Sequence, residues 1–92
     1  MTEWIWDADK ARANLEKHGI PFEAAIEVFD DPMLLSEPDP HPDGDRWRVI
    51  GKVWMTTLFV VHTIFNEEGG GRIISARRVT PSERKRYDDG YS

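Results

Sequence analysis

Six cationic side chains lie between positions 72 and 87 against one acid, Glu83, and they could hold phosphate groups. They are Arg72, Arg77, Arg78, Arg84, Lys85 and Arg86. The planar fork of arginine binds two phosphate oxygens at once. Cleavage of a phosphate ester without a metal needs cations for the charge on the phosphorane, a base for the attacking hydroxyl and an acid for the leaving oxygen. Arg77 and Arg78 are the leading catalytic candidates.

The strand predicted over residues 73–79 determines where these arginines point. It is rich in β-branched residues, and side chains alternate between the faces of a strand. One side carries Ile73, Ser75 and Arg77, and the other carries Ile74, Ala76 and Arg78. We expect Ile74 and Ala76 to face the core, so Arg77 lies on the open face of the sheet and is favoured over Arg78. The competing interpretation is that both arginines form surface ion pairs with the acidic half of the chain.

Two further residues could transfer protons or contact a substrate. His62 lies in the middle of an apolar segment, and its imidazole could act as base or acid near neutral pH. A histidine among aliphatic residues can equally be a packed core residue with a hydrogen-bond partner. Tyr87 could offer a hydroxyl or stack on a base, or it could anchor a helix.

A second strand offers additional arginines. Arg46 and Arg48 share one side of the segment 46–53 and could extend a phosphate-binding track, together with Arg72 and Ser75. The alternative is a solvated strand face. Glu83 is expected to act as a helix-capping residue or an arginine partner rather than as a general base.

Composition and charge restrict the class of protein. The chain has 92 residues, no cysteine and a net charge of −5, with a balance of −9 in residues 1–45 and +4 in residues 46–92. The three histidines have neither close spacing nor cysteine support, so no metal site or cofactor is predicted. The N-terminus has no secretory pattern and no apolar run is long enough to span a membrane, so we expect a cytoplasmic protein.

The elements that position these residues follow from periodicity and breakers. Helices are predicted over residues 8–18 and 21–29, and a short one begins after Thr80, which has the type of an N-cap. Strands are predicted over residues 33–36, 46–53, 57–65 and 73–79, with a short extended entry at 3–6. The expected fold is α+β. Two N-terminal helices pack on an antiparallel sheet of about four to five strands, and a short C-terminal helix completes a single domain, 1–92.

The blocks Lys17-His18-Gly19 and Ile73-Ile74-Ser75-Ala76-Arg77-Arg78 are specific in combination. With scattered matches from Trp4 to Tyr87, they make the chain resemble the BrnT family, small toxins of type II toxin–antitoxin pairs. The resemblance implies a RelE-like fold, a ribonuclease activity that stalls translation, and a BrnA-like antitoxin with a ribbon-helix-helix DNA-binding domain. Lys10 and Lys17 match the family pattern and become candidates for substrate binding, although they also fit an ordinary exposed helix stripe.

A second function from a different class stays open at this point. The same basic strand and helix could belong to a non-catalytic binding module that grips an acidic protein or a nucleic acid. The turn Trp54-Met55-Thr56 supports this alternative, because it lacks the Gly-Arg pair common in the family. A metal-dependent hydrolase is a remote third possibility.

Overall fold

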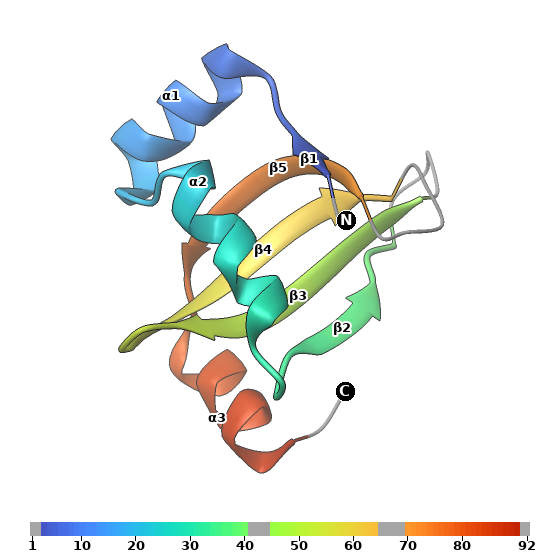
Figure 1. Cartoon of the computed structure of the whole chain (residues 1–92). Helices are drawn as coiled ribbons and strands as arrows, with labels where there is room; N and C mark the ends of the chain where they lie inside the picture. The colour runs from blue at the N-terminus through green and yellow to red at the C-terminus, as the bar shows by residue number, and fades with distance from the viewer. Residues whose placement is uncertain (1–2, 41–44, 65–69, 91–92) are drawn as a thin grey trace.

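The computed structural model describes residues 3–40, 45–64 and 70–90, and its helices and strands confirm the predicted α+β class (Figure 1). The elements in chain order are β1 (Trp4–Ile5), α1 (Ala8–His18), α2 (Phe22–Ala25), the 3-10 helix η1 (Ile26–Asp30), β2 (Leu35–Pro38), β3 (Arg46–Val53), β4 (Thr56–Thr63), β5 (Gly71–Arg78) and α3 (Pro81–Asp89). The loops predicted around His41 and residues 66–69 lie outside the described residues. No helix among the described residues is long and apolar enough to cross a membrane.

The five strands form one sheet in the order β1-β5-β4-β3-β2. Neighbours from β2 to β5 are antiparallel, but β1 pairs with β5 in parallel, with Trp4 opposite Gly71. The predicted antiparallel pairing is confirmed from β2 to β5, whereas the parallel pairing of β1 was not predicted. A parallel pair needs a long crossover between its strands, and here both N-terminal helices and three strands intervene.

Strand β2 begins two residues later than predicted because of Asp31. Its carboxylate accepts hydrogen bonds from the backbone N–H of Met33 at 2.8 Å and of Lys52 at 2.7 Å. These bonds hold residues 32–33 in a turn and join that turn to β3. The second predicted helix also differs from expectation, because it is α-helical over Phe22–Ala25 and continues as the 3-10 helix η1.

A β-bulge changes which side chains of β5 enter the core. Val61 pairs with Ser75 but His62 pairs with Ile73, so Ile74 is the extra residue. Such a bulge shifts the alternation by one position. Ile73 is consequently buried beside Ala76, and the prediction that Ile74 occupies this core position was wrong.

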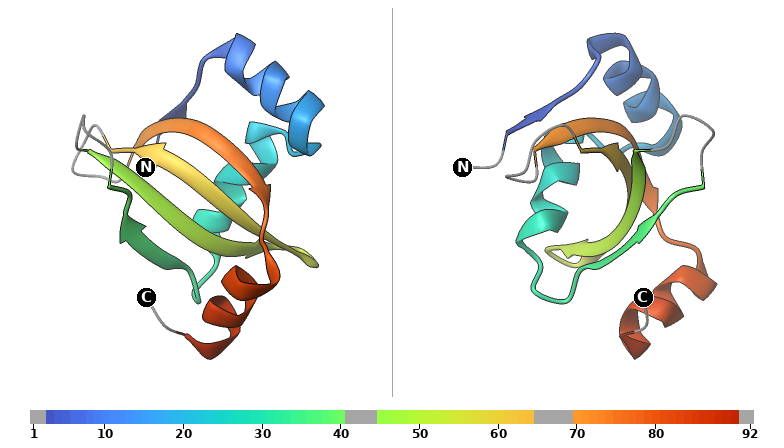
Figure 2. Two further views of the ribbon diagram at one scale, coloured as in Figure 1. Left: turned by 180° about the vertical axis from the view of Figure 1, so that it is seen from behind. Right: turned by 90° about the vertical axis from the view of Figure 1, so that its right-hand side faces the viewer.

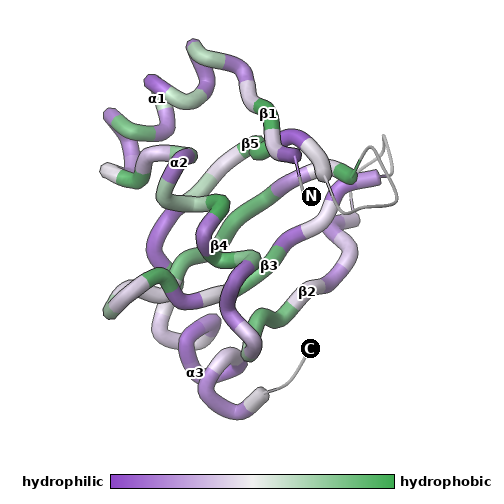
Figure 3. The backbone as a smooth tube through the Cα atoms, viewed as in Figure 1, coloured by the Kyte–Doolittle hydropathy of each residue, from purple (hydrophilic) through white to green (hydrophobic). Residues whose placement is uncertain are grey.

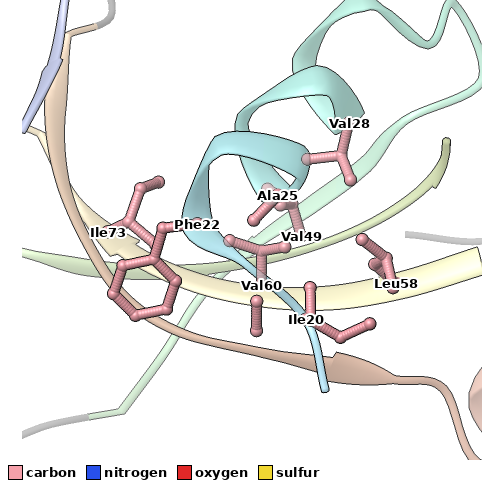
Figure 4. Packing of buried hydrophobic residues seen from close by; sticks show 9 residues of the cluster. Ile20, Phe22, Ala25, Val28, Val49, Leu58, Val60 and Ile73 are labelled. Atoms are coloured by element: carbon pink, nitrogen blue, oxygen red, sulfur yellow. The ribbon is translucent and has the colours of Figure 1, made fainter. Parts of the chain in front are cut away.

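The apolar core lies between the sheet and the N-terminal helices. The sheet curves around α2 and η1, while α3 lies on the opposite side (Figure 2). The core side chains are Ile20, Phe22, Ala25, Val28, Val49, Leu58, Val60, Ile73 and Ala76 (Figure 4). Among the strands, apolar residues concentrate in β4, whereas α3 is hydrophilic along most of its length (Figure 3). The helix α3 therefore packs without contributing to this core.

The β3–β4 hairpin ends in an exposed tryptophan. Trp54 is 89% exposed, and its φ is 56°. Trp4 and Trp6 instead pack on the core through Phe29 and Phe22. A positive φ is unusual for a bulky residue. Here Val53 pairs with Thr56, so Trp54 is the first residue of a two-residue hairpin loop, and such loops need a positive φ at that position.

Buried Asn14 joins α1 to the strand that carries the arginines. Its amide donates to the carbonyl oxygens of Ile20 at 3.0 Å and Ala76 at 2.8 Å, and its oxygen accepts from the N–H of Ala76 at 3.1 Å. One side chain thus satisfies backbone groups on both sides of the α1–β5 contact, where an unsatisfied group would be costly.

We expect Asn14→Ala to lower the free energy of unfolding by about 2–3 kcal/mol, because it leaves buried backbone groups of Ala76 unpaired. Chemical denaturation measures this change. The matched variant Glu16→Ala, on the exposed side of α1, should stay within about 0.5 kcal/mol of the parent chain. Equal stability of the two variants would contradict the role given to Asn14.

Candidate functional site

The sheet face opposite α1 and α2, here called the open face, carries a row of arginines. Register places Glu37, Arg48, Val61 and Ser75 side by side across β2–β5, and Leu35, Ile50, Phe59 and Arg77 in the next row. Arg46 lies on the same face at the start of β3, opposite Thr63. Arg46, Arg48, Ser75 and Arg77 therefore share one surface, which α3 partly covers.

Arg77 is held in a bidentate ion pair by Glu83 of α3. Its Nη1 and Nη2 donate to the two carboxylate oxygens at 2.8 and 2.9 Å, and its guanidinium lies 4.2 Å from the centre of the Phe59 ring. The hydrogen bond raises the pKa of Arg77 and lowers the pKa of Glu83. Glu83 also accepts from the N–H of Thr80 in a capping box, as the sequence suggested. An ionised carboxylate with these partners is a poor general base.

A second carboxylate, Glu37, bridges two more arginines. It accepts from Nε of Arg48 and from Nη2 of Arg86, both at 2.8 Å. The hydrogen bond from Arg86 is the largest cause of the lowered pKa of Glu37. The three side chains help to line a small cavity over Ile50 and Phe59. Arg86 was counted among the basic residues but not assigned to the site. The spacing of Glu83, Arg86 and Tyr87, at i, i+3 and i+4, was the signal that they share one helix face.

Tyr87 connects the far end of α3 to the turn before β2. Its hydroxyl donates to Oδ2 of Asp31 at 2.5 Å. Burial and this bond raise the pKa of Tyr87 to about 12. Burial alone would raise the pKa of Asp31, but the bonds from Tyr87, Met33 and Lys52 lower it overall. The hydroxyl of Tyr87 is therefore protonated at neutral pH and already engaged as a donor.

His62 lies on the core face, behind the sheet from Arg77. It is 4% exposed, and its ring packs edge-on against Trp4 and Phe29, with centroids 5.1 Å apart in both cases. Nδ1 lies 2.9 Å from the carbonyl oxygen of Thr63, while Nε2 has no hydrogen-bond partner among the described residues. Burial lowers the pKa of His62, which favours the neutral ring. The fold does not bring His62 and Arg77 to one surface.

The remaining candidates are dispersed. Arg72 is exposed and lines a surface cavity with Asp7, at the edge where β1 joins β5. Arg78 is exposed on the opposite side of β5 from Arg77, and its side chain has no ion pair within the described part of the chain. Lys10 and Lys17 are exposed on α1, in the layer behind the sheet. The structure thus groups Arg46, Arg48, Ser75 and Arg77, and leaves the two lysines apart.

The geometry of the open face suits binding of a polyanion. Guanidinium groups from two strands and a helix meet around two carboxylates, above an apolar floor. This fold matches that of a solved ribonuclease toxin. The chain is similar to "1.1 Angstrom-resolution crystal structure of the Brucella abortus ribonuclease toxin, BrnT", with a TM-score of 0.66 and 24% identity over 87% of this chain and 99% of that chain. At this identity the likeness concerns the fold.

Sequence comparison then gives the family. The model described as "Ribonuclease toxin, BrnT, of type II toxin-antitoxin system" matches residues 6–83, and a search of curated proteins finds no significant match. The chain belongs to the BrnT family of ribonuclease toxins. Membership in a type II toxin–antitoxin family implies an antitoxin partner.

The buried neutral state of His62 predicts a loss of stability in mild acid. The pKa of His62 is lowered in the folded chain, whereas an unfolded histidine has a pKa of about 6.5. As pH falls below about 6.5 the unfolded state therefore binds the proton first, and folding weakens until the folded pKa is passed. Between pH 6.5 and 5 the free energy of unfolding should drop by about 1 kcal/mol.

Denaturation at several pH values checks this prediction. His62→Phe keeps an aromatic ring against Trp4 and Phe29 but cannot titrate, so its stability should be nearly flat over this range. The paired acids Glu37 and Glu83 have lowered pKa values. The stability that they contribute is therefore retained in this range and lost only at lower pH. A parent chain whose stability is flat between pH 6.5 and 5 would contradict the assignment.

Proposed function

We propose that this chain is a metal-independent endoribonuclease that inhibits translation by cleaving RNA on the open face. The observation that carries the proposal is the guanidinium fork of Arg77, aimed at a carboxylate on a face that also presents Arg46 and Arg48. The fork that holds a carboxylate in two hydrogen bonds also fits two oxygens of a phosphate. The family membership supports RNA as the substrate class.

In this mechanism Arg77 contacts the scissile phosphate and stabilises the negative charge that develops on it. Such a preorganised donor acts mainly in the transition state, where the charge is larger. Arg46, Arg48, Arg72 and Ser75 hold the flanking backbone. These roles require contact between side chain and phosphate, so each should be measurable as a loss of binding or of rate.

Tyr87 remains the candidate donor to the leaving oxygen, and its hydroxyl would first have to leave Asp31. His62 is behind the sheet, and we assign it a packing role that supports β4. Arg78, Lys10 and Lys17 are kept as peripheral contacts to the RNA backbone, outside the reacting centre.

We further propose a BrnA-like antitoxin with a ribbon-helix-helix domain as the partner, in the cytoplasm. Its neutralising segment would cover the open face and should carry acidic side chains, because that face is lined by arginines. The whole chain, 1–92, acts as one toxin domain in this proposal. DNA binding belongs to the antitoxin.

Cleavage of RNA by the purified chain tests the proposed activity. We expect cleavage to persist in excess EDTA and to fall about 10²–10³-fold in Arg77→Ala, because a charge-stabilising donor is lost. The matched control Arg12→Ala removes an arginine from α1, where it pairs with Asp9 at the surface, and should keep the full rate. Circular dichroism confirms that both variants fold.

Two outcomes would count against the proposal. Loss of cleavage in EDTA that returns with a divalent ion would indicate a metal-dependent enzyme. Binding of RNA without cleavage by the folded chain would favour the non-catalytic binding module.

Growth of a host that expresses the chain alone tests the toxin role and the partner. We expect arrested growth and degraded transcripts. Growth should be rescued when a ribbon-helix-helix protein encoded by the adjacent gene is co-expressed. Arg77→Ala should grow normally without the antitoxin. Normal growth with abundant folded parent chain, or failure of the neighbour to bind it, would contradict the assignment.

A further inference from the structure

Hydrogen bonds and ion pairs attach the C-terminal helix α3 to the open face. None of its residues is buried. Three side-chain contacts join it to the rest of the chain, namely Glu83 with Arg77, Arg86 with Glu37, and Tyr87 with Asp31. Contacts of this kind are weakened by competing ions, whereas a buried apolar face would not be.

Internal carboxylates occupy the guanidinium groups that a phosphate would need. Glu83 fills both donors of the Arg77 fork, and Glu37 takes Nε of Arg48. Carboxylate and phosphate oxygens accept hydrogen bonds from arginine in the same geometry. Arg48 lies on β3 and Arg77 on β5, with β4 between them, in successive rows of the open face. The two carboxylates therefore occupy two anion positions on one face of the sheet.

The helix is stabilised at both ends and along its surface by contacts among its own residues. Thr80 and Glu83 form a capping box at its start, and Gly90 closes its end in a left-handed conformation. Two ion pairs at i, i+4 spacing lie along its surface, between Arg84 and Asp88 and between Lys85 and Asp89. The last backbone bond that ties the segment before α3 to the sheet runs from the N–H of Val79 to Thr57 at 3.3 Å. Residues 79–80 are therefore the natural hinge.

We propose that α3 is a lid, and that Glu83 and Glu37 occupy two phosphate subsites of the open face until RNA replaces them. This inference rests on the proposed ribonuclease function and adds to it a resting state that is closed. Entry of RNA exchanges each carboxylate for one backbone phosphate, at Arg77 and at Arg48, while α3 moves away about residues 79–80. Two subsites on one face select a polynucleotide over a single nucleotide.

The neutral variants Glu83→Gln and Glu37→Gln test the lid directly. Glutamine retains the capping-box role at position 83 but loses the charge that holds Arg77. We expect both variants to bind a non-cleavable 2′-deoxy oligonucleotide about 3–10-fold more tightly, and to cleave RNA faster, because one ion pair at an exposed site has modest strength. Asp88→Asn removes a carboxylate from α3 that pairs only within the helix and should match the parent.

Two readouts without RNA report the lid position. Trypsin should cut at Arg84 and Lys85 faster in Glu83→Gln than in Asp88→Asn. A cross-link that holds α3 on the sheet gives the opposite perturbation. It can be placed at two chosen positions because the chain has no cysteine of its own. The double variant Glu37→Cys and Arg86→Cys, bridged by a reducible bis-thiosulfonate reagent, should lose RNA binding and cleavage at least about tenfold and regain both on reduction.

The outcomes separate the lid from the activity. Cleavage that is unchanged in Glu83→Gln and in the locked protein would overturn the lid and leave the ribonuclease standing. Slower cleavage and weaker binding in Glu83→Gln would also overturn it, because Glu83 would then position Arg77 for the substrate. No cleavage and no RNA binding by the parent, by the glutamine variants and by the reduced double variant would overturn the proposed function, and the lid with it.

Discussion

The pairing of open-face arginines with the chain's own carboxylates is the constraint on which the rest of the structure depends. A partly buried guanidinium without a partner is unfavourable, and Arg77 lies over the ring of Phe59. Glu83 supplies the missing partner and at the same time caps the helix that carries it. A face rich in arginine can thus fold without a bound anion, and α3 is placed over the arginines as a consequence.

The two faces of the sheet differ in what they contact. The concave face packs on α2 and η1 and excludes water, and it also takes His62 into an aromatic cluster. The convex face has an apolar floor at Ile50 and Phe59 that is ringed by charge. Because side chains alternate, β5 serves both purposes, with Ala76 facing the core and Arg77 facing outward. Asn14 fixes that strand to α1 by bonding to Ala76.

Family membership concerns the class of activity, whereas the local geometry concerns individual residues. The BrnT family supplies the class of activity, a ribonuclease toxin with an antitoxin partner. The likeness to the Brucella abortus toxin concerns the fold. The assignment of individual roles rests on the contacts of this chain, and these favour Arg77 and Arg48 over His62, since only the arginines share the open face.

Local signals in the sequence were enough to place most elements and Arg77. Periodicity, the N-cap at Thr80 and the breakers around Pro32 act within a few residues, so α1, β3 and α3 were recovered from the chain itself. Only the tertiary structure decided the parallel pairing of β1, the bulge at Ile74, and the contact of Arg86 with Glu37 across 49 positions. These features depend on which distant segments of the chain come together, and the spacing of residues within a segment does not predict that.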